Sequence, residues 1–254
     1  MNSFLSWIGG KKLLREEIVS RFPDNFDKYI EVFGGAGWVL FHKDRHANYE
    51  VYNDYNSELV NLFRCVKYHR EELQKELSFF LNSRELFHDF LAQYKVQGLT
   101  DIQRAARYFI LIKTSYASKG ATYGCVKKDS SKYIEYLTDI QKRLVNVIIE
   151  NRDFEKLINT YDRKNTLFYL DPPYWGTEKY YKEVDFKPED HIRLKQILDN
   201  IQGNFILSYN DCPEIRELYK SYNIDEVNRK NNLKSRYKDN TNQSYNELII
   251  KNYW

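Results

Sequence analysis

Cysteine is scarce in this sequence, and its spacing provides no cross-linked framework. The 254 residues include three cysteines, five prolines and one methionine. Cys65, Cys125 and Cys212 are odd in number and lie far apart, which fits neither a set of disulfides nor a CxxC zinc site. His42 and His46 have the i, i+4 spacing of a metal pair, but HKDRH lacks the glutamate of HExxH and no third ligand stands out. We therefore expect free, buried thiols and no metal.

Long apolar runs are also absent. The sequence contains no stretch of about 18 apolar residues, the length needed to cross a membrane. The opening MNSFLSWIGGKK has neither a basic leader nor an apolar segment long enough for a secretion signal. Hydrophobic residues make up 42% of the chain and charged residues 30%, which predicts a soluble, cytoplasmic protein without membrane contact. The net charge of +3 is mild, so binding to nucleic acid would depend on local clusters of positive charge.

The length of the chain and its first elements favour an α/β fold. A chain of 254 residues can form one sizeable domain, or a core domain that carries a large insertion. The apolar spacing of 12–22 predicts a helix. A strand ending near Phe33, a glycine turn, a helix beginning in WVLFHKDRH and a second strand at 51–54 would form a β-α-β unit. Such a unit binds a nucleotide-like ligand at the carboxyl ends of its strands.

The predicted secondary structure of the rest of the chain is first helical and then alternates between strands and helices. Residues 57–160 carry helical spacing without a convincing strand pattern, which predicts a helical insertion. Strand patterns return at 166–174, 204–210, 223–227 and in the closing ELIIKNYW. Between two of them, KPEDHIRLKQILDNI has the pattern of a crossover helix. The apolar residues expected on one side of this helix are Ile192, Leu194, Ile197 and Leu198.

Two features near the first strands suit a nucleoside ligand. The backbone N–H groups of the turn Phe33-Gly34-Gly35-Ala36-Gly37 could approach a ligand closely because glycine has no Cβ. No third glycine completes GxGxxG, which counts against a dinucleotide-phosphate site. Asp54 ends the second predicted strand, where a carboxylate can accept hydrogen bonds from ribose hydroxyls. Asp54 or Asn56 could equally be the N-cap of a following helix, so both interpretations of Asp54 stay open.

The motif Asp171-Pro172-Pro173-Tyr174 decides the type of chemistry. An interior strand should not run into two prolines, which have no N–H to donate. The prolines fix the backbone, so the Asp171 carboxylate and the Pro172 carbonyl could both accept from one –NH2 group. The ring of Tyr174 offers a face on which a base could stack, a contact worth about 1–3 kcal/mol. A plain structural turn would explain the prolines but not the acid and the aromatic residue beside them.

A fourth motif, FLSWIGGKK, occupies residues 4–12. It could be a capped N-terminal turn. Alternatively, Trp7 could cover a flat or cationic group while Lys11 reaches an anion such as a carboxylate.

In this order, the four motifs resemble the D12 class of adenine-specific DNA methyltransferases, which includes the bacterial Dam methylases. FLSWIGGKK is similar to the FxKWxGGK motif of that family, EVFGGAG to its cofactor turn, YNDYNSELV to its ribose strand, and YLDPPY to its catalytic motif. Further similarity lies in RAARYFILIKTSY, NRDFEKLI, FILSYND and ELIIKNY. The resemblance implies that catalysis depends on Asp171, Pro172 and Tyr174. It also implies that S-adenosylmethionine, the methyl donor, is bound by Trp7, Lys11, Phe33, Gly35, Gly37, Asp54, Asp153, Phe154 and Asp171.

The resemblance also assigns the insertion, with the loop at 113–128, to target recognition. Dam proteins carry NGLxR-like residues after the equivalent of KTSY, whereas this chain has ASKGATYGCVKK, so the GATC specificity of Dam is not transferred. A proline that usually precedes the phenylalanine of the glycine turn is Val32 here, and the glycines keep the turn possible. Basic and aromatic residues near this loop and before the last strand could contact double-stranded DNA, although solvated polar loops would carry them too. The predicted contacts are Lys113, Ser115, Tyr116, Lys119, Lys127 and Arg236.

We therefore predict a doubly wound, Rossmann-like, largely parallel sheet from residues 1–56 and 161–254, with a mainly helical target-recognition domain at 57–160. The enzyme would flip an adenine out of the duplex and methylate its N6 amino group from S-adenosylmethionine, without a metal or a covalent intermediate. An RNA or other exocyclic-amine methyltransferase, a non-catalytic nucleic-acid-binding module and a nicotinamide dehydrogenase are alternatives. The sequence is compatible with a monomer and with a role in restriction-modification. It predicts neither the target sequence nor an accompanying restriction enzyme.

Overall fold

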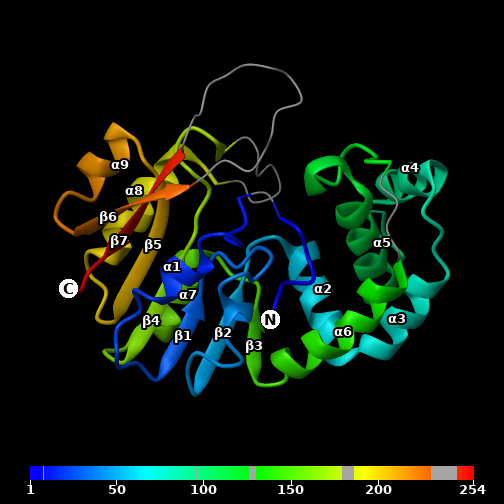
Figure 1. The fold of residues 1–254 in the computed structure, drawn as a ribbon, viewed down its shortest axis with the longest axis horizontal. Helices are drawn as coiled ribbons and strands as arrows, with labels where there is room; N and C mark the ends of the chain where they lie inside the picture. Colours follow the sequence, from blue (N-terminus) through cyan, green and yellow to red (C-terminus); the bar gives the residue numbers. More distant parts are fainter. Residues whose placement is uncertain (8, 95, 126–129, 179–185, 230–244) are drawn as a thin grey trace. The chain divides into compact units, whose positions relative to one another are not determined.

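The computed structural model describes residues 1–7, 9–94, 96–125, 130–178, 186–229 and 245–254. Within these ranges the chain separates into two compact units, each made from two segments (Figure 1). The first unit comprises Met1–Lys11 and Gly34–Arg152, and the second comprises Lys12–Phe33 and Asp153–Trp254. No helix in the described ranges is both long and apolar enough to cross a membrane.

The described strands of the second unit form a mixed sheet in the order β1-β4-β5-β7-β6. In the second unit β1, β4 and β5 pair in parallel, whereas β7 pairs antiparallel with β5 and β6. In the first unit β2 and β3 pair in parallel. These pairings confirm the predicted α/β class and a largely parallel, Rossmann-like sheet. The strands are β1 Lys28–Glu31, β2 Tyr49–Asn53, β3 Val147–Glu150, β4 Thr166–Leu170, β5 Asn204–Asn210, β6 Asn223–Arg229 and β7 Tyr245–Lys251.

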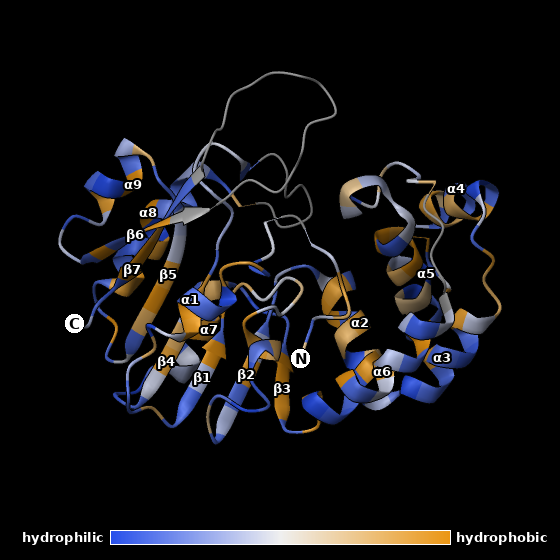
Figure 2. Ribbon diagram, in the orientation of Figure 1, coloured by the Kyte–Doolittle hydropathy of each residue, from blue (hydrophilic) through white to orange (hydrophobic). Residues whose placement is uncertain are grey.

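The core of the second unit lies along its parallel strands. All five residues of β4 are buried, as are the five central residues of β5, and the centre of β5 is strongly apolar (Figure 2). Burial along a whole strand is typical of parallel strands that are covered on both faces. The helices of this unit are α1 Arg15–Val19, α7 Phe154–Tyr161, α8 Pro188–Leu198 and α9 Pro213–Leu218.

Most of the first unit is helical. Helix α5 packs against α2, α3 and α4, and α6 packs against α2 and α3 (Figure 1). The start of α5 is fixed by a capping box, in which Thr100 and Gln103 each satisfy the backbone N–H of the other. Phe87, Phe90 and Leu111 form an apolar cluster between α4 and α5. The helices of this unit are α2 Ser57–Tyr68, α3 Arg70–Ser78, α4 Arg84–Gln93, α5 Asp101–Thr114 and α6 Ser130–Leu144, with 3-10 turns η1 Leu40–His42 and η2 Tyr116–Ser118.

Strand β3 was not predicted, because residues 57–160 were assigned no strand. It pairs with β2 from Val147 opposite Glu50 to Glu150 opposite Asn53. A four-residue apolar run has no periodicity that separates a strand from a helix, so this pairing is not visible in the sequence. Within this segment the helices α2 to α6 therefore end at Leu144, before β3, and α7 follows the strand.

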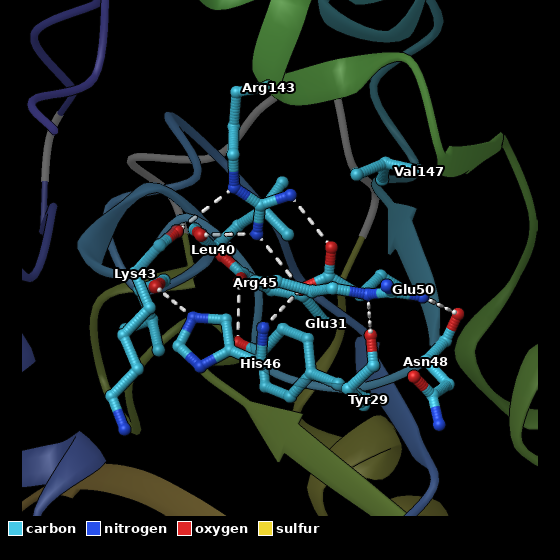
Figure 3. Close-up of polar contacts among 12 residues, drawn as sticks. Tyr29, Glu31, Leu40, Lys43, Arg45, His46, Asn48, Glu50, Arg143 and Val147 are labelled. Atoms are coloured by element: carbon cyan, nitrogen blue, oxygen red, sulfur yellow. Dashed lines mark hydrogen bonds and ion pairs between the residues drawn. The ribbon is translucent and has the colours of Figure 1, made fainter.

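Two helical predictions were also wrong in detail. The segment after the glycine turn forms only the 3-10 turn η1, where the side chain of Arg143 donates to the carbonyls of Leu40 and Lys43 (Figure 3). On α8, Leu194 and Leu198 are buried as expected, but Ile192 is 49% exposed.

A buried ion pair joins α6 to β2 within the first unit (Figure 3). The Nη1 and Nη2 atoms of Arg143 donate to Oε2 and Oε1 of Glu50 at 2.7 and 2.9 Å. Their side chains are only 5% and 3% exposed. The backbone N–H of His46 also donates to Oε1 of Glu50, at 2.8 Å. Arg143 therefore ties the last turn of α6 to both β2 and the chain around η1.

Candidate active site

The glycine turn is tied to the end of β2 by backbone hydrogen bonds. The N–H of Gly34 donates to the carbonyl of Asn53 at 2.8 Å, and the N–H of Gly37 donates to the carbonyl of Gly34 at 2.7 Å. Gly35 and Gly37 have φ of 49° and 69°, in the left-handed region that favours glycine. A Cβ on Gly34 would lie 2.2 Å from the ring of Tyr52. The shape of the turn itself therefore requires these glycines.

Asp54 fastens this turn to the start of α2. Its Oδ2 accepts from the N–H of Gly35 and its Oδ1 from the N–H of Asn56, both at 2.8 Å. Asn56 is the N-cap of α2, because its side chain accepts from the N–H groups of Glu58 and Leu59. Of the two capping residues considered from the sequence, Asn56 has that role.

The Asp54 carboxylate is buried at the carboxyl end of β2. Asp54 is 8% exposed. Burial raises the pKa of its carboxyl group, and the hydrogen bonds from the backbone N–H groups of Asn56 and Gly35 offset part of that rise. Each carboxylate oxygen can accept more than one hydrogen bond, so a ribose hydroxyl could add to those already present.

The N-terminal motif brings an indole ring to the same turn. Trp7 lies against Gly35, where a Cβ would approach the indole Cδ1 to 3.0 Å. Lys11 is 4% exposed, and its Nζ donates to the carbonyl of Gly9 at 3.0 Å. Trp7, Gly35 and Asp54, which the sequence analysis grouped as cofactor contacts, therefore lie together in the first unit.

Three phenylalanine rings form a cluster in the second unit. The ring centroid of Phe33 lies 5.6 Å from that of Phe154 and 6.0 Å from that of Phe186, and the last two are 6.0 Å apart. The guanidinium of Arg193 covers Phe154 at 4.1 Å from the ring centroid. Phe33 and Phe154 were both predicted cofactor contacts, whereas no role was predicted for Phe186 or Arg193.

Asp153 is the N-cap of α7 and is also paired with Arg193. Its Oδ1 accepts from the N–H of Glu155 at 3.0 Å. Nη2 and Nη1 of Arg193 donate to Oδ2 and Oδ1 of Asp153 at 2.9 and 3.2 Å. Asp153 therefore stabilises the start of α7, whatever contact it makes with a ligand.

The chain leaves the sheet at Asp171, one residue after the end of β4. Pro172 and Pro173 are buried, whereas Asp171 and Tyr174 are partly exposed. The parallel strands β1 and β5 flank β4, so the motif emerges at the edge of the sheet where α/β proteins bind ligands. The two prolines therefore stand where the chain leaves the sheet, as expected from the sequence.

Tyr174 is held at several points. Its hydroxyl donates to Oε2 of Glu247 at 2.7 Å, and its ring lies 6.0 Å from that of Tyr209. Its carbonyl accepts from the N–H and the hydroxyl of Thr177, both at 2.9 Å. Burial raises the pKa of Tyr174 well above its usual value, and the negative charges of Asp171 and Glu247 raise it further. Tyr174 therefore stays protonated and remains a donor.

Comparison with known proteins identifies the family of this chain. The model of the D12 class N6 adenine-specific DNA methyltransferase family matches residues 7–233. This chain belongs to that family. It is thus an adenine-specific DNA methyltransferase, which confirms the function predicted from the four motifs.

Relatives of the methyltransferase match it along most of their length. The type II methyltransferase M1.LlaDCHI of Lactococcus lactis subsp. cremoris is 28% identical over 279 residues, covering 100% of this chain and 96% of the relative. The type II methyltransferase M.MjaIII of Methanocaldococcus jannaschii is 30% identical over 289 residues, covering 98% of each. A DNA adenine methylase of Haemophilus influenzae is 25% identical over 254 residues, covering 88% of this chain and 85% of the relative.

The loop after α5 of the methyltransferase has a defined shape. Ser115 is 5% exposed, and its Oγ accepts from the N–H of Gly120 at 2.8 Å. Tyr116 is 70% exposed, and Lys119 is also exposed. Nζ of Lys113 lies 4.1 Å from the ring centroid of Tyr133. Two other predicted DNA contacts, Lys127 and Arg236, lie outside the described residues.

A buried histidine anchors the segment after the catalytic motif. His191 on α8 contacts the hydroxyl of Tyr209 through Nδ1 and Oε1 of Glu178 through Nε2, the latter at 3.0 Å. The same Oε1 accepts from the N–H of Gly176 at 2.8 Å. Burial lowers the pKa of His191, so its neutral form is favoured. The sequence signal for this contact was a single histidine on a buried helix face, which does not identify its partners.

Proposed function

We propose that this methyltransferase takes a methyl group from S-adenosylmethionine and transfers it to the N6 amino nitrogen of an adenine flipped out of double-stranded DNA. The observation that carries the proposal is the segment Asp171–Tyr174. An acid, two buried prolines and an aromatic ring follow a fully buried strand, and the hydroxyl of the ring is held by Glu247. An acceptor for an amino group and a face for a planar base suit an adenine.

The predicted cofactor residues fit the chemistry of S-adenosylmethionine. The buried Asp54 carboxylate, beside a turn that has no Cβ at Gly35, suits ribose hydroxyls. Lys11 would pair with the carboxylate of the methionine part, and Trp7 would cover a flat or cationic group. The bound cofactor would supply a methyl group on a positively charged sulfur. The full proposed set is Trp7, Lys11, Phe33, Gly35, Gly37, Asp54, Asp153, Phe154 and Asp171.

Catalysis by this chain would consist of positioning and charge stabilisation. An adenine inside a duplex is inaccessible, so it must be flipped out at a cost of a few kcal/mol. Stacking on Tyr174 would offset part of that cost. The Asp171 carboxylate and the Pro172 carbonyl would accept hydrogen bonds from the amino group and orient its nitrogen. Asp171 would also stabilise the positive charge that develops as the nitrogen is methylated.

We assign target recognition to the helical part of the first unit, Ser57–Leu144, which shortens the domain of 57–160 expected from the sequence. Tyr116 and Lys119 would contact the duplex from the loop after α5. Ser115, which is buried and holds Gly120, would act by shaping that loop. The type II methyltransferases among the relatives support a role in restriction-modification, and we place the activity in the cytoplasm.

Methyl transfer from labelled S-adenosylmethionine tests the proposal. The purified protein should label adenine N6 in duplex oligonucleotides, and a 2-aminopurine at the target position should become fluorescent as it leaves the stack. Label on RNA but not on DNA, or methylation without any fluorescence change, would overturn the substrate or the flipping step respectively.

Asp54→Ala should weaken the binding of S-adenosylmethionine. The cofactor would lose the acceptor for its ribose hydroxyls, and the N–H groups of Gly35 and Asn56 would lose theirs. We expect the Kd to rise by about 10-fold or more. Calorimetry on folded protein measures this directly, with Asp225→Ala, a change on β6, as control. An unchanged Kd would leave Asp54 with only its role in the turn.

Lys119→Ala and Tyr116→Ala should separate affinity from target choice. If Lys119 contacts a phosphate, its loss lowers the slope of log K against log salt by about 1. Tyr116→Ala should instead reduce flipping or alter the methylated sequence, because an exposed ring can fill the gap that a flipped base leaves. Lys220→Ala is the matched control, since Lys220 is an exposed lysine of the second unit. Unchanged salt slope and unchanged methylated sites would place recognition elsewhere in the helices.

A further inference from the structure

Glu247 is a buried carboxylate for which no role was predicted from the sequence. It lies on β7, opposite Asn210 of β5 and Val227 of β6, and is 3% exposed. A charge so deeply buried is costly unless it is hydrogen-bonded. Its Oε2 accepts the hydroxyl of Tyr174 at 2.7 Å. Glu247, on a strand far from the catalytic motif in sequence, therefore contacts the hydroxyl group of Tyr174.

This bond completes a set of restraints on Tyr174. Thr177 donates to its carbonyl, Tyr209 packs near its ring, and Glu247 holds its hydroxyl. An O–H donor to a carboxylate is about twice as strong as a neutral pair. Because the pKa of Tyr174 is raised by burial and by nearby negative charge, the hydroxyl keeps the proton that the bond needs.

We propose that Glu247 is a positioning residue of the methyltransferase, which sets the orientation of the Tyr174 ring for the target base. The inference rests on the proposed function, in which Tyr174 stacks on the flipped adenine. Without the bond the ring would rotate about its side-chain torsions, and the stacked, in-line arrangement would be populated less often. The loss should therefore fall on kcat and on the flipped population, and not on the affinity for S-adenosylmethionine.

Variants of Tyr174 and Glu247 distinguish a positioning role of this bond from simple stacking by the ring. If Tyr174 supplied only a ring face, Tyr174→Phe would be nearly silent. If Glu247 positions the ring, Tyr174→Phe and Glu247→Leu remove the same bond, and the double variant should be hardly worse than either single variant. Glu247→Gln keeps an acceptor oxygen, so it should restore most of what Glu247→Leu loses.

The experiment is a double-mutant cycle on the full chain, measured in kcat, in the Kd of S-adenosylmethionine and in thermal unfolding. We expect Tyr174→Phe and Glu247→Leu each to lower kcat roughly 10- to 100-fold, as loss of a charged hydrogen bond predicts. The Kd should stay within about twofold, and Glu247→Gln should lose less than about fivefold in kcat. Tyr222→Phe is the matched control, because its hydroxyl makes a 2.7 Å bond to the carboxylate of Asp199 away from the motif.

Three results would overturn the inference. The first is that the effects of Tyr174→Phe and Glu247→Leu on kcat are additive, and the second is that Tyr174→Phe has the kcat of wild type. The third is that the two changes are coupled in the free energy of unfolding but not in kcat, which would give the bond only a structural role. If Glu247→Leu fails to fold, the kcat values of Tyr174→Phe and Glu247→Gln still test the inference, because only Tyr174→Phe removes the bond. Absence of methyl transfer by the wild type would instead contradict the proposed function, and coupling in unfolding would still show whether the bond exists.

Discussion

Asp171→Ala should lower kcat/KM by about 10²–10³-fold or more while the protein remains folded. Asp171 follows β4 and is partly exposed, so its removal leaves no cavity in the core. Its loss would take away both the acceptor that orients the amino group and the charge that stabilises the cation. Single-turnover transfer of labelled methyl groups measures the effect, and circular dichroism checks the fold.

Asp171→Asn separates the two contributions of this residue. The amide keeps one acceptor oxygen but has no charge, so its activity should lie between those of wild type and Asp171→Ala. Asp225→Ala serves as control, since Asp225 pairs with Arg21 and Lys251 on other elements. If Asp171→Ala retains most of its single-turnover rate, the catalytic assignment is wrong.

Arg143→Ala should destabilise the protein by about 3–5 kcal/mol, because it leaves the buried Glu50 carboxylate without its partner. It also removes the donors to the carbonyls of Leu40 and Lys43. Replacing both members of the pair, as Arg143→Met with Glu50→Gln, should cost less than Arg143→Ala, since no buried charge remains unpaired.

Urea unfolding followed by circular dichroism measures these differences. Lys142→Ala is the neighbouring control, because Lys142 is 73% exposed and its pair with Asp139 should contribute less than about 1 kcal/mol. A free energy of unfolding for Arg143→Ala within about 1 kcal/mol of wild type would contradict the prediction.

Features encoded over a few neighbouring residues could be predicted from the sequence. Strands β4 and β5 were located because each is a short apolar run bounded by turn residues or prolines. Asp171 and Tyr174 were predicted to be catalytic because two prolines follow a buried strand between them, and this assignment stays a prediction. The short strand β3 was missed, because VIIE has no period that tells a strand from a helix.

Contacts between distant segments could not be predicted in this way. Arg143 donates to the carbonyl of Leu40, about a hundred residues earlier in the chain, and nothing near Leu40 signals this contact. Likewise, Glu247 belongs to an ordinary strand pattern, and only the pairing of β7 with β5 brings it to Tyr174. Arg193 was missed for the same reason, since an arginine on a helix surface has many possible partners.

Each of the two units is built from separated segments, and this has consequences during synthesis. Strand β1 leaves the ribosome long before β4, with which it pairs from Lys28 opposite Thr166. Until β4 has been synthesised, the edge of β1 that pairs with β4 remains unpaired. This favours slow folding and a need for chaperones. A fragment that stops at Arg152 would contain every residue of the first unit. It would also carry Lys12–Phe33, in which strand β1 would lack its partner β4, and we expect such a fragment to aggregate.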